Sequence, residues 1–179
     1  MSKESEKIKV IFQSSQSRFR QLTHKTMNNN VQQQQQKSNT VQFTTFQLAD
    51  ELFGIDVLQV QEILPYQEIT PVPLAPEYVK GLINLRGRIV TVLDLRSRLG
   101  FERLEDETTG TNLIVISHEG PISVFVDQIG NVLDIQSDRL TPPPGTVRGV
   151  AAQYIQEVCQ LEDELLIALD LKSILQDES

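Results

Sequence analysis

Short apolar runs separated by turn residues fill the chain from Val41 onward. Residues 41–49 place apolar side chains on both faces of a predicted strand, and residues 52–55 return after an Asp50-Glu51 turn. The other runs that predict strands are 59–64, 82–85, 88–93, 112–117, 122–126, 132–135, 147–150, 155–161 and 165–169. Strands recur about every 8–12 residues, and the predicted helices are too short for a parallel α/β sheet. The pattern predicts a mostly β fold built as small barrels.

Turn and capping residues mark where these elements end. Arg86-Gly87 is predicted to join 82–85 to 88–93 as a hairpin, since glycine supplies the positive φ that a tight turn needs. Asp94 has the chemistry of a helix N-cap, and Gly100 lies where a glycine would end a short helix. Asp170 is predicted to cap a final short helix over 171–176 in the same way.

Glycine and proline predict the remaining turns and irregular connections. Gly120-Pro121 and Gly130-Asn131 are predicted turns between strands. Residues 70–76 and 142–145 are rich in proline, which lacks an amide donor and disfavours helix in the residue before it. Residues 102–110 form a predicted acidic loop.

Residues 1–40 have a different composition from the rest of the chain. Residues 28–36 are an Asn/Gln tract that cannot supply enough apolar area to offset the entropy of chain ordering. We interpret 1–40 as a disordered basic tail, with the domain boundary near Thr40. The mixed basic and apolar residues 8–22 leave open a weak surface helix that touches anionic lipid or an acidic partner.

Charge separates the same two regions. Residues 1–40 hold seven basic and two acidic side chains, a net charge of +5, so that residues 41–179 hold −13 of the total of −8. A body this acidic repels phosphate backbones, which argues against nucleic-acid binding by the domain. Its length is that of one ordinary domain, which buries roughly two-thirds of its unfolded surface without needing a metal or a disulfide.

The cysteine count and the hydropathy pattern predict a cytoplasmic location. One cysteine, Cys159, cannot form an internal disulfide, which favours a reducing compartment. No apolar run approaches the roughly 18 residues needed to cross a bilayer. Residues 8–12 are too short and too charged for the apolar region of a secretory signal.

Residues with catalytic chemistry are sparse, and we expect no enzyme, no cofactor and no metal. His24 and His118 are the histidines, and both are interpreted as surface residues. Cys159 is interpreted as a small buried hydrophobe inside a strand. No phosphate-binding glycine loop, dinucleotide fingerprint, HExxH or paired CxxC motif occurs in the sequence. An enzyme with a diffuse carboxylate site is a disfavoured alternative.

The amount of apolar side chain on the predicted strands exceeds what one barrel can bury. Ile55, Val57, Val60, Ile63 and Leu64 fall in one run, and several strands have two apolar faces. Since a small barrel buries one face, the surplus must meet a second barrel or partner proteins.

Several segments together resemble the CheW family. They are the runs FTTFQLADELFGIDVLQVQEI (43–63), PVP (71–73), APEYVKGLINLRG (75–87), VTVLDL (90–95) and LLIALDL (165–171). The resemblance covers about 41–176. It implies two SH3-like, five-stranded β-barrel subdomains with short helices, over 41–108 and 109–179.

The resemblance also implies a function. A CheW-like protein is a non-catalytic cytoplasmic adaptor, recruited to receptor arrays, that couples the cytoplasmic tip of a methyl-accepting chemoreceptor to the regulatory domain of a CheA-type histidine kinase. Flagellar and pilus-based pathways both remain open. A small β-barrel nucleic-acid-binding protein is the alternative, which the acidic body disfavours.

Six residues match family positions implicated in receptor coupling: Val57, Val60, Glu62, Gly81, Arg86 and Gly87. By its chemistry, Arg86 can pair with Glu62 as an internal brace or with an acid of the receptor. Gly81 and Gly87 are interpreted as backbone requirements more than as contacts. Glu157 departs from the family pattern, which has glycine there, and its side chain is expected to affect the local strand.

We predict that a chain lacking residues 1–40 stays folded and keeps its binding to the kinase, because the family does not require this segment. Thermal unfolding and a pull-down with a CheA-type kinase check the prediction. Loss of either property would show that the tail is part of the domain.

Overall fold

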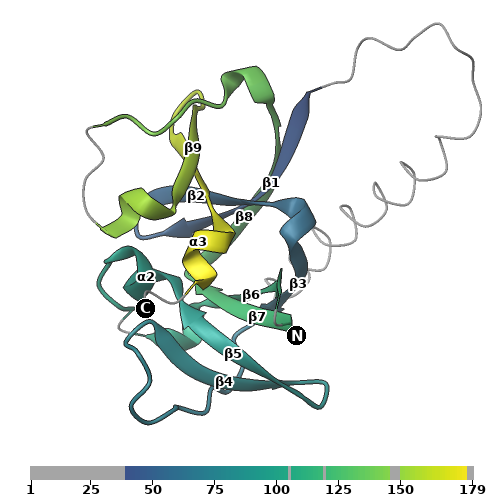
Figure 1. The fold of residues 1–179 in the computed structure, drawn as a ribbon, viewed down its shortest axis with the longest axis vertical. Helices are drawn as coiled ribbons and strands as arrows, with labels where there is room; N and C mark the ends of the chain where they lie inside the picture. The colour runs from purple at the N-terminus through teal and green to yellow at the C-terminus, as the bar shows by residue number, and fades with distance from the viewer. Residues whose placement is uncertain (1–38, 105, 119, 146–149, 177–179) are drawn as a thin grey trace, which may run out of the picture.

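The computed structural model describes residues 39–104, 106–118, 120–145 and 150–176, which form two five-stranded sheets (Figure 1). Sheet A has the order β8-β1-β2-β10-β9, from β1 (Thr40–Leu48), β2 (Glu51–Asp56), β8 (Gln128–Gln136), β9 (Ile155–Gln160) and β10 (Leu165–Leu169). Sheet B has the order β3-β6-β7-β5-β4, from β3 (Val60–Pro65), β4 (Val79–Leu85), β5 (Arg88–Asp94), β6 (Thr111–Ser117) and β7 (Gly120–Val126). The mostly β, two-sheet prediction is confirmed, while the predicted tail lies almost wholly outside the described residues.

The two sheets do not divide the chain in sequence order. Sheet B takes its strands from residues 60–126, and sheet A takes its strands from both sides of that stretch. The expected division into 41–108 and 109–179 is therefore wrong. The reason is physical: β1 pairs with β8 and β2 pairs with β10, and periodicity along a chain carries no information about such distant partners.

The topology of the first half recurs in the second. If β1–β5 are matched to β6–β10, the strand order of sheet A becomes that of sheet B. Each half ends in a short helix, α2 (Leu95–Leu99) or α3 (Leu171–Leu175), capped by Asp94 or Asp170. The amide of each capping aspartate donates to a tyrosine carbonyl at the same spacing, Tyr78 or Tyr154, at 2.8 Å.

One apolar cluster lies between the sheets and belongs to both. The rings of Phe46 and Phe53 on sheet A stack with centroids 6.2 Å apart and share this cluster with Leu113 and Val124 of sheet B. Separate clusters fill the interior of each barrel. The second apolar face that the sequence predicts is thus buried largely against the other barrel.

Arg98 on α2 joins the barrels through buried polar contacts. Its residue is 6% exposed, and its guanidinium lies 4.2 Å from the ring centre of Tyr78 and 5.1 Å from that of Tyr154. Nε donates to the carbonyl of Ile174 at 3.2 Å, and a terminal nitrogen donates to the carbonyl of Gln176 at 2.5 Å. One side chain therefore satisfies carbonyls at the end of α3 while it stacks on a tyrosine from each half.

Local predictions based on capping are confirmed, and some turn predictions are wrong. Asp94 accepts a hydrogen bond from the Ser97 amide, and Gly100 is left-handed with φ 84°. Gly130-Asn131 lies inside β8, at a bulge where the Thr45 hydroxyl donates to the carbonyl of Asn131 at 2.6 Å. This close crossing, not a turn, requires glycine, because a Cβ on Gly130 would lie 2.4 Å from Thr45 Oγ1.

Two further predictions differ from the structure. Gly120-Pro121, a predicted turn between strands, forms the first two residues of β7. Of the strand predicted over 147–150, residues 147–149 lie outside the described residues, and Val150 begins a 3₁₀ helix (Val150–Tyr154).

We predict that Arg98→Ala lowers the free energy of unfolding by about 2–4 kcal/mol, because the buried carbonyl of Ile174 loses its donor, the carbonyl of Gln176 loses a hydrogen bond and the two tyrosines lose their packing partner. Urea unfolding measures the change. Lys172→Ala, an exposed cation on α3, serves as the control and is expected to cost about 0.5 kcal/mol or less. Equal effects of the two variants would contradict the role assigned to Arg98.

Candidate functional site

Sheets A and B close into barrels A and B, and the candidate site lies at the end of barrel B where the β4–β5 hairpin turns. Leu85 pairs with Arg88, so Arg86 and Gly87 form a two-residue turn, and their φ values are 53° and 84°. Positive φ at both positions is typical of a type I′ turn, which matches the twist of the flanking strands. Asn84 Oδ1 accepts a hydrogen bond from the Gly87 amide at 2.8 Å, which fixes the turn.

Arg86 forms an ion pair with Glu62 on β3, one of the two partners that its chemistry leaves open. The side chain of Glu62 is 18% exposed, whereas that of Arg86 is 74% exposed. Since β3 and β4 are the two edges of sheet B, this pair helps to close the barrel, together with the backbone bridge between Thr70 and Leu82. A guanidinium has five donors, so Arg86 can brace the barrel and still present donors to solvent.

Gly81 is a backbone requirement at the other end of β4. Its φ is 148°, and a Cβ there would lie 2.4 Å from the carbonyl oxygen of Thr70. The β4–β5 register shifts between Val79 and Gly81, so the strand bulges where the Thr70 segment crosses it. Gly87, by contrast, has open space around the position of a Cβ and needs glycine for its φ alone.

Val57 and Val60 do not form an exposed apolar edge. Asp56 caps the short 3₁₀ helix η2 (Val57–Gln59) by accepting from the Leu58 amide at 2.9 Å. Val57 is half-buried, and Val60 is half-buried against the cluster shared by both barrels. The exposed apolar residue here is Leu58, at 66%, which the sequence reasoning did not select.

Two further isoleucines are exposed at the same end of barrel B. Ile116, near the end of β6, is 59% exposed and lies on the same face as Ile114, the residue opposite Glu62. Ile89 follows Arg88 on β5 and is 68% exposed. We call Leu58, Glu62, Arg86, Arg88, Ile89 and Ile116 the hairpin-end surface. The sequence gives no signal for these isoleucines, because an apolar residue in a strand is expected to be buried.

A second charged joint connects the barrels at the other end of β5 and β7, away from the hairpin turn. Arg96 on α2 makes two hydrogen bonds to the carboxylate of Asp127, at 2.6 and 2.5 Å. The same carboxylate accepts from the amide of Ala49 in the β1–β2 turn at 2.8 Å. Hydrogen bonding to Asp127 raises the pKa of Arg96 against the opposing effect of burial, so the arginine stays charged. The joint ties α2 to sheet A.

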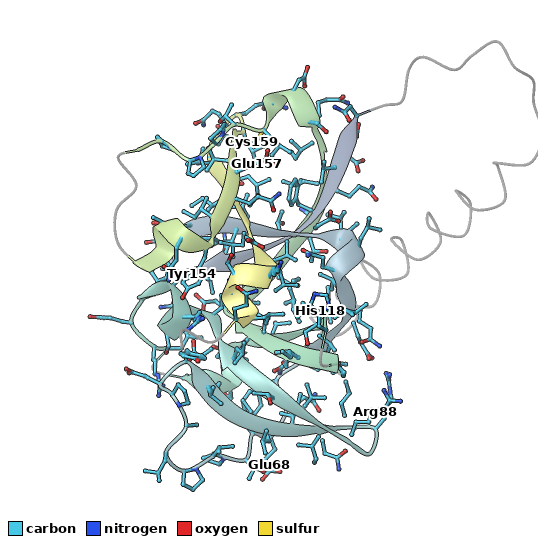
Figure 2. All side chains as sticks on the ribbon, viewed as in Figure 1. Glu68, Arg88, His118, Tyr154, Glu157 and Cys159 are labelled. Atoms are coloured by element: carbon cyan, nitrogen blue, oxygen red, sulfur yellow. The ribbon has the colours of Figure 1, made fainter. Side chains whose placement is uncertain are left out.

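Glu157, where the family resemblance predicts glycine, lies on β9 (Figure 2) at the position that corresponds to Gly81 on β4. It is half-buried and lies opposite Ala168. A bridge from Thr141 to Val158 corresponds to the bridge from Thr70 to Leu82. Among the described residues, the non-glycine positions with positive φ are Ala49, Leu74 and Arg86, so Glu157 takes an ordinary φ. The backbone at Glu157, next to the Thr141–Val158 bridge, therefore differs in conformation from the backbone at Gly81, next to the Thr70–Leu82 bridge.

The site brings together charges and apolar side chains suited to contact with another protein. Within the described ranges, no group of three or more His, Cys, Asp or Glu side chains could hold a metal ion. Cys159 is 1% exposed, as its interpretation as a buried hydrophobe requires, and His118 is exposed (Figure 2). None of the helices described here is long and apolar enough to span a bilayer.

Comparison with known proteins gives consistent matches. The family model described as CheW-like domain matches residues 42–179. "Chemotaxis protein CheW" of Treponema pallidum is 34% identical over 137 residues, covering 74% of this chain and 81% of that protein. The Klebsiella aerogenes protein of that name is 29% identical over 137 residues, covering 76% and 82%. The crystal structure of scaffolding protein TtCheW from Thermoanaerobacter tengcongensis matches with a TM-score of 0.70 at 28% identity, covering 77% of this chain and 94% of that one.

We predict that Gly81→Ala and Gly87→Ala differ in cost. Gly81→Ala combines an unfavourable φ with a backbone clash and is expected to lower the unfolding free energy by about 2–3 kcal/mol or more. Gly87→Ala meets no neighbour and is expected to cost about 1 kcal/mol. Chemical denaturation of both variants measures the difference. A tolerated Gly81→Ala would overturn its assignment as a backbone requirement.

Proposed function

The chain belongs to the CheW-like domain family of chemotaxis scaffolds, and from this premise we propose that it couples the cytoplasmic tip of a methyl-accepting chemoreceptor to the regulatory domain of a CheA-type histidine kinase. It acts without catalysis, in the cytoplasm, where the receptor array recruits it. Flagellar and pilus-based pathways use such adaptors, and the proposal covers both.

The observation that supports the receptor-facing role best is the exposure of Arg86 on a fixed turn. Its side chain is 74% exposed although it is ion-paired, and exposed Leu58 and Ile116 lie at the same end of the barrel. A cation beside exposed apolar side chains fits a partner that offers a carboxylate and an apolar helix face. The charged and apolar parts of the hairpin-end surface are thus complementary to a helical receptor tip.

The six residues selected from the sequence take different parts in this proposal. Arg86 contacts the receptor, and Glu62 holds Arg86 in place. Gly87 and Val60 shape the hairpin end of the barrel through the turn and the shared apolar cluster, whereas Gly81 shapes the opposite end of β4 through the bulge. Val57 positions η2, and its exposed neighbour Leu58 makes an apolar contact with the receptor.

An adaptor has to hold two partners in a fixed relative orientation, and the barrel joint suits this requirement. Arg98 and the Arg96–Asp127 pair connect the barrels through hydrogen bonds that restrict rotation, which an apolar interface alone does less well. For both partners to be held at once, the kinase has to bind away from the hairpin-end surface.

We predict that Arg86→Glu weakens binding to a receptor signalling fragment by about tenfold or more, because it places a like charge against a receptor carboxylate. Binding to the kinase is expected to stay close to wild type, and the free energy of unfolding is expected to fall by about 1 kcal/mol, since the variant loses the pair with Glu62 and places a like charge beside it. Pull-downs with each partner and a reconstituted kinase assay measure these effects, and Lys172→Glu is the matched control.

The double variant Glu62→Arg/Arg86→Glu separates the two roles of Arg86. It restores the internal pair with reversed polarity, so receptor binding recovers if Arg86 acts only as a brace and stays weak if Arg86 contacts the receptor. We expect it to stay weak. If the wild-type chain binds neither the kinase nor the receptor fragment, the adaptor proposal fails.

A further inference from the structure

The outer side of β8 is an edge of sheet A. β8 pairs with β1 along one side, and no strand or bridge among the described residues pairs with its other side. The bridge at Thr141 engages β9, the opposite edge of the sheet. Of the nine residues of β8, Ile135 alone is buried, so the strand is not covered by another element. An edge of this kind can take up an extended peptide as an added strand.

The start of the described chain lies at one end of this edge. Thr40, the first residue of β1, pairs with Gln136, the last residue of β8, and Figure 1 shows the two strands side by side. The carbonyl of Asn39 accepts hydrogen bonds from the amide and the hydroxyl of Ser137, both at 2.6 Å. Residues 1–38 are therefore attached directly beside β8.

One run within residues 1–38 has the composition of a strand. Residues 8–12 read Ile-Lys-Val-Ile-Phe, and β-branched and aromatic residues, which favour strands, fill four of these five positions. A run of five residues is of ordinary strand length. The Asn/Gln tract over 28–36 has no such preference, so residues 8–12 are the segment of the tail best suited to pair with a sheet edge.

The length of the intervening chain fits this pairing. Residues 13–39 are about 27 residues of mostly polar chain, which as a flexible linker has a root-mean-square span of roughly 28 Å. A nine-residue strand such as β8 is about 30 Å long. Since the linker span matches the length of the edge, the effective concentration of residues 8–12 at β8 is on the order of millimolar.

Charge complementarity favours the same contact. Asp134 on β8 and Asp138 in the 3₁₀ helix that follows (Ser137–Arg139) are exposed, and Lys7 and Lys9 flank or interrupt the apolar run. Asp134 accepts from Gln42 at 2.5 Å, and a carboxylate can accept from further donors. Arg139, the cation beside them, donates to the carbonyl of Gln160 on β9. The lysines can therefore pair with acids at the end of β8 where the tail begins.

We propose that residues 8–12 add to sheet A as a sixth strand along the outer edge of β8. Main-chain hydrogen bonds to β8 supply the affinity, and Lys7 and Lys9 interact with Asp134 and Asp138. The acidic partner that the sequence leaves open for the tail is then the domain of the same chain. The docked strand covers an edge that would otherwise be open to pairing with other chains. The proposal does not rest on the adaptor function.

Amide hydrogen exchange of the full chain tests the docking. Val10→Pro removes the central amide donor of the segment, so the amides of β8 that point away from β1 are expected to exchange about tenfold faster than in the wild type. Val31→Pro, the matched control in the Asn/Gln tract, is expected to leave them unchanged. Amides of β6, which lies in the other sheet, report that the fold is intact. Equal exchange at β8 in the wild type and Val10→Pro would overturn the proposal.

Charge reversal within the tail tests the pairing with the acids. Lys7→Glu/Lys9→Glu is expected to speed exchange at the same β8 amides by about threefold or more, because the segment then repels Asp134 and Asp138. Lys3→Glu/Lys25→Glu makes the same change of charge outside the segment and is expected to have a smaller effect. Equal effects of the two double variants would contradict the register of residues 8–12 on β8.

Concentration distinguishes the occupants of the edge. Docking within one chain is expected to give the same protection of β8 when the protein is diluted tenfold. Protection that falls on dilution would overturn the proposal, because the added strand would then come from a second copy. Protection that appears in the wild type only after anionic phospholipid vesicles are added would overturn it too, since the lipid surface and not β8 would then order the segment.

Discussion

The buried guanidinium of Arg98 fixes how the two barrels meet. It stacks on Tyr78 from one half and Tyr154 from the other, and it donates to two carbonyls at the end of α3. An apolar interface such as the one around Phe46 and Leu113 is strong but tolerates small rotations. Directional hydrogen bonds from a planar fork restrict those rotations. The relative position of every surface on the two barrels therefore depends on this side chain.

Closure of each barrel depends on a smaller set of contacts. In barrel B the Thr70–Leu82 bridge and the Arg86–Glu62 pair connect the two edge strands, and in barrel A the Thr141–Val158 bridge has the corresponding place. Both barrels thus limit the exposure of edge strands that would otherwise pair with other chains. Arg86 combines a structural role with exposure to solvent, so its guanidinium is held in place and stays accessible.

Local chemistry made much of this structure predictable. Asp94, Gly100 and the Arg86-Gly87 turn act through neighbours a few residues away, and the Arg86–Glu62 pair follows from complementary charge on segments that the family resemblance relates. The partition of strands between sheets, the bulge at Gly130 and the stacking of Arg98 depend on residues far apart in sequence. Periodicity predicts that Ile116, as an apolar residue in a strand, is buried. Only the closed barrel shows that no other element covers its side chain near the end of β6.

The interleaving of the halves sets an order on synthesis of the chain by the ribosome. Sheet B can close once β7 has emerged, at Val126, whereas sheet A needs β10, which ends at Leu169. At about 5–20 residues per second, the β1–β2 hairpin, which ends at Asp56, waits about 6–20 seconds for the last of its partners. During that time its two edges are unpaired, while the hairpin-end surface of barrel B can already form. A nascent chain thus completes the end of barrel B that carries Arg86 first, and the β9–β10 hairpin last.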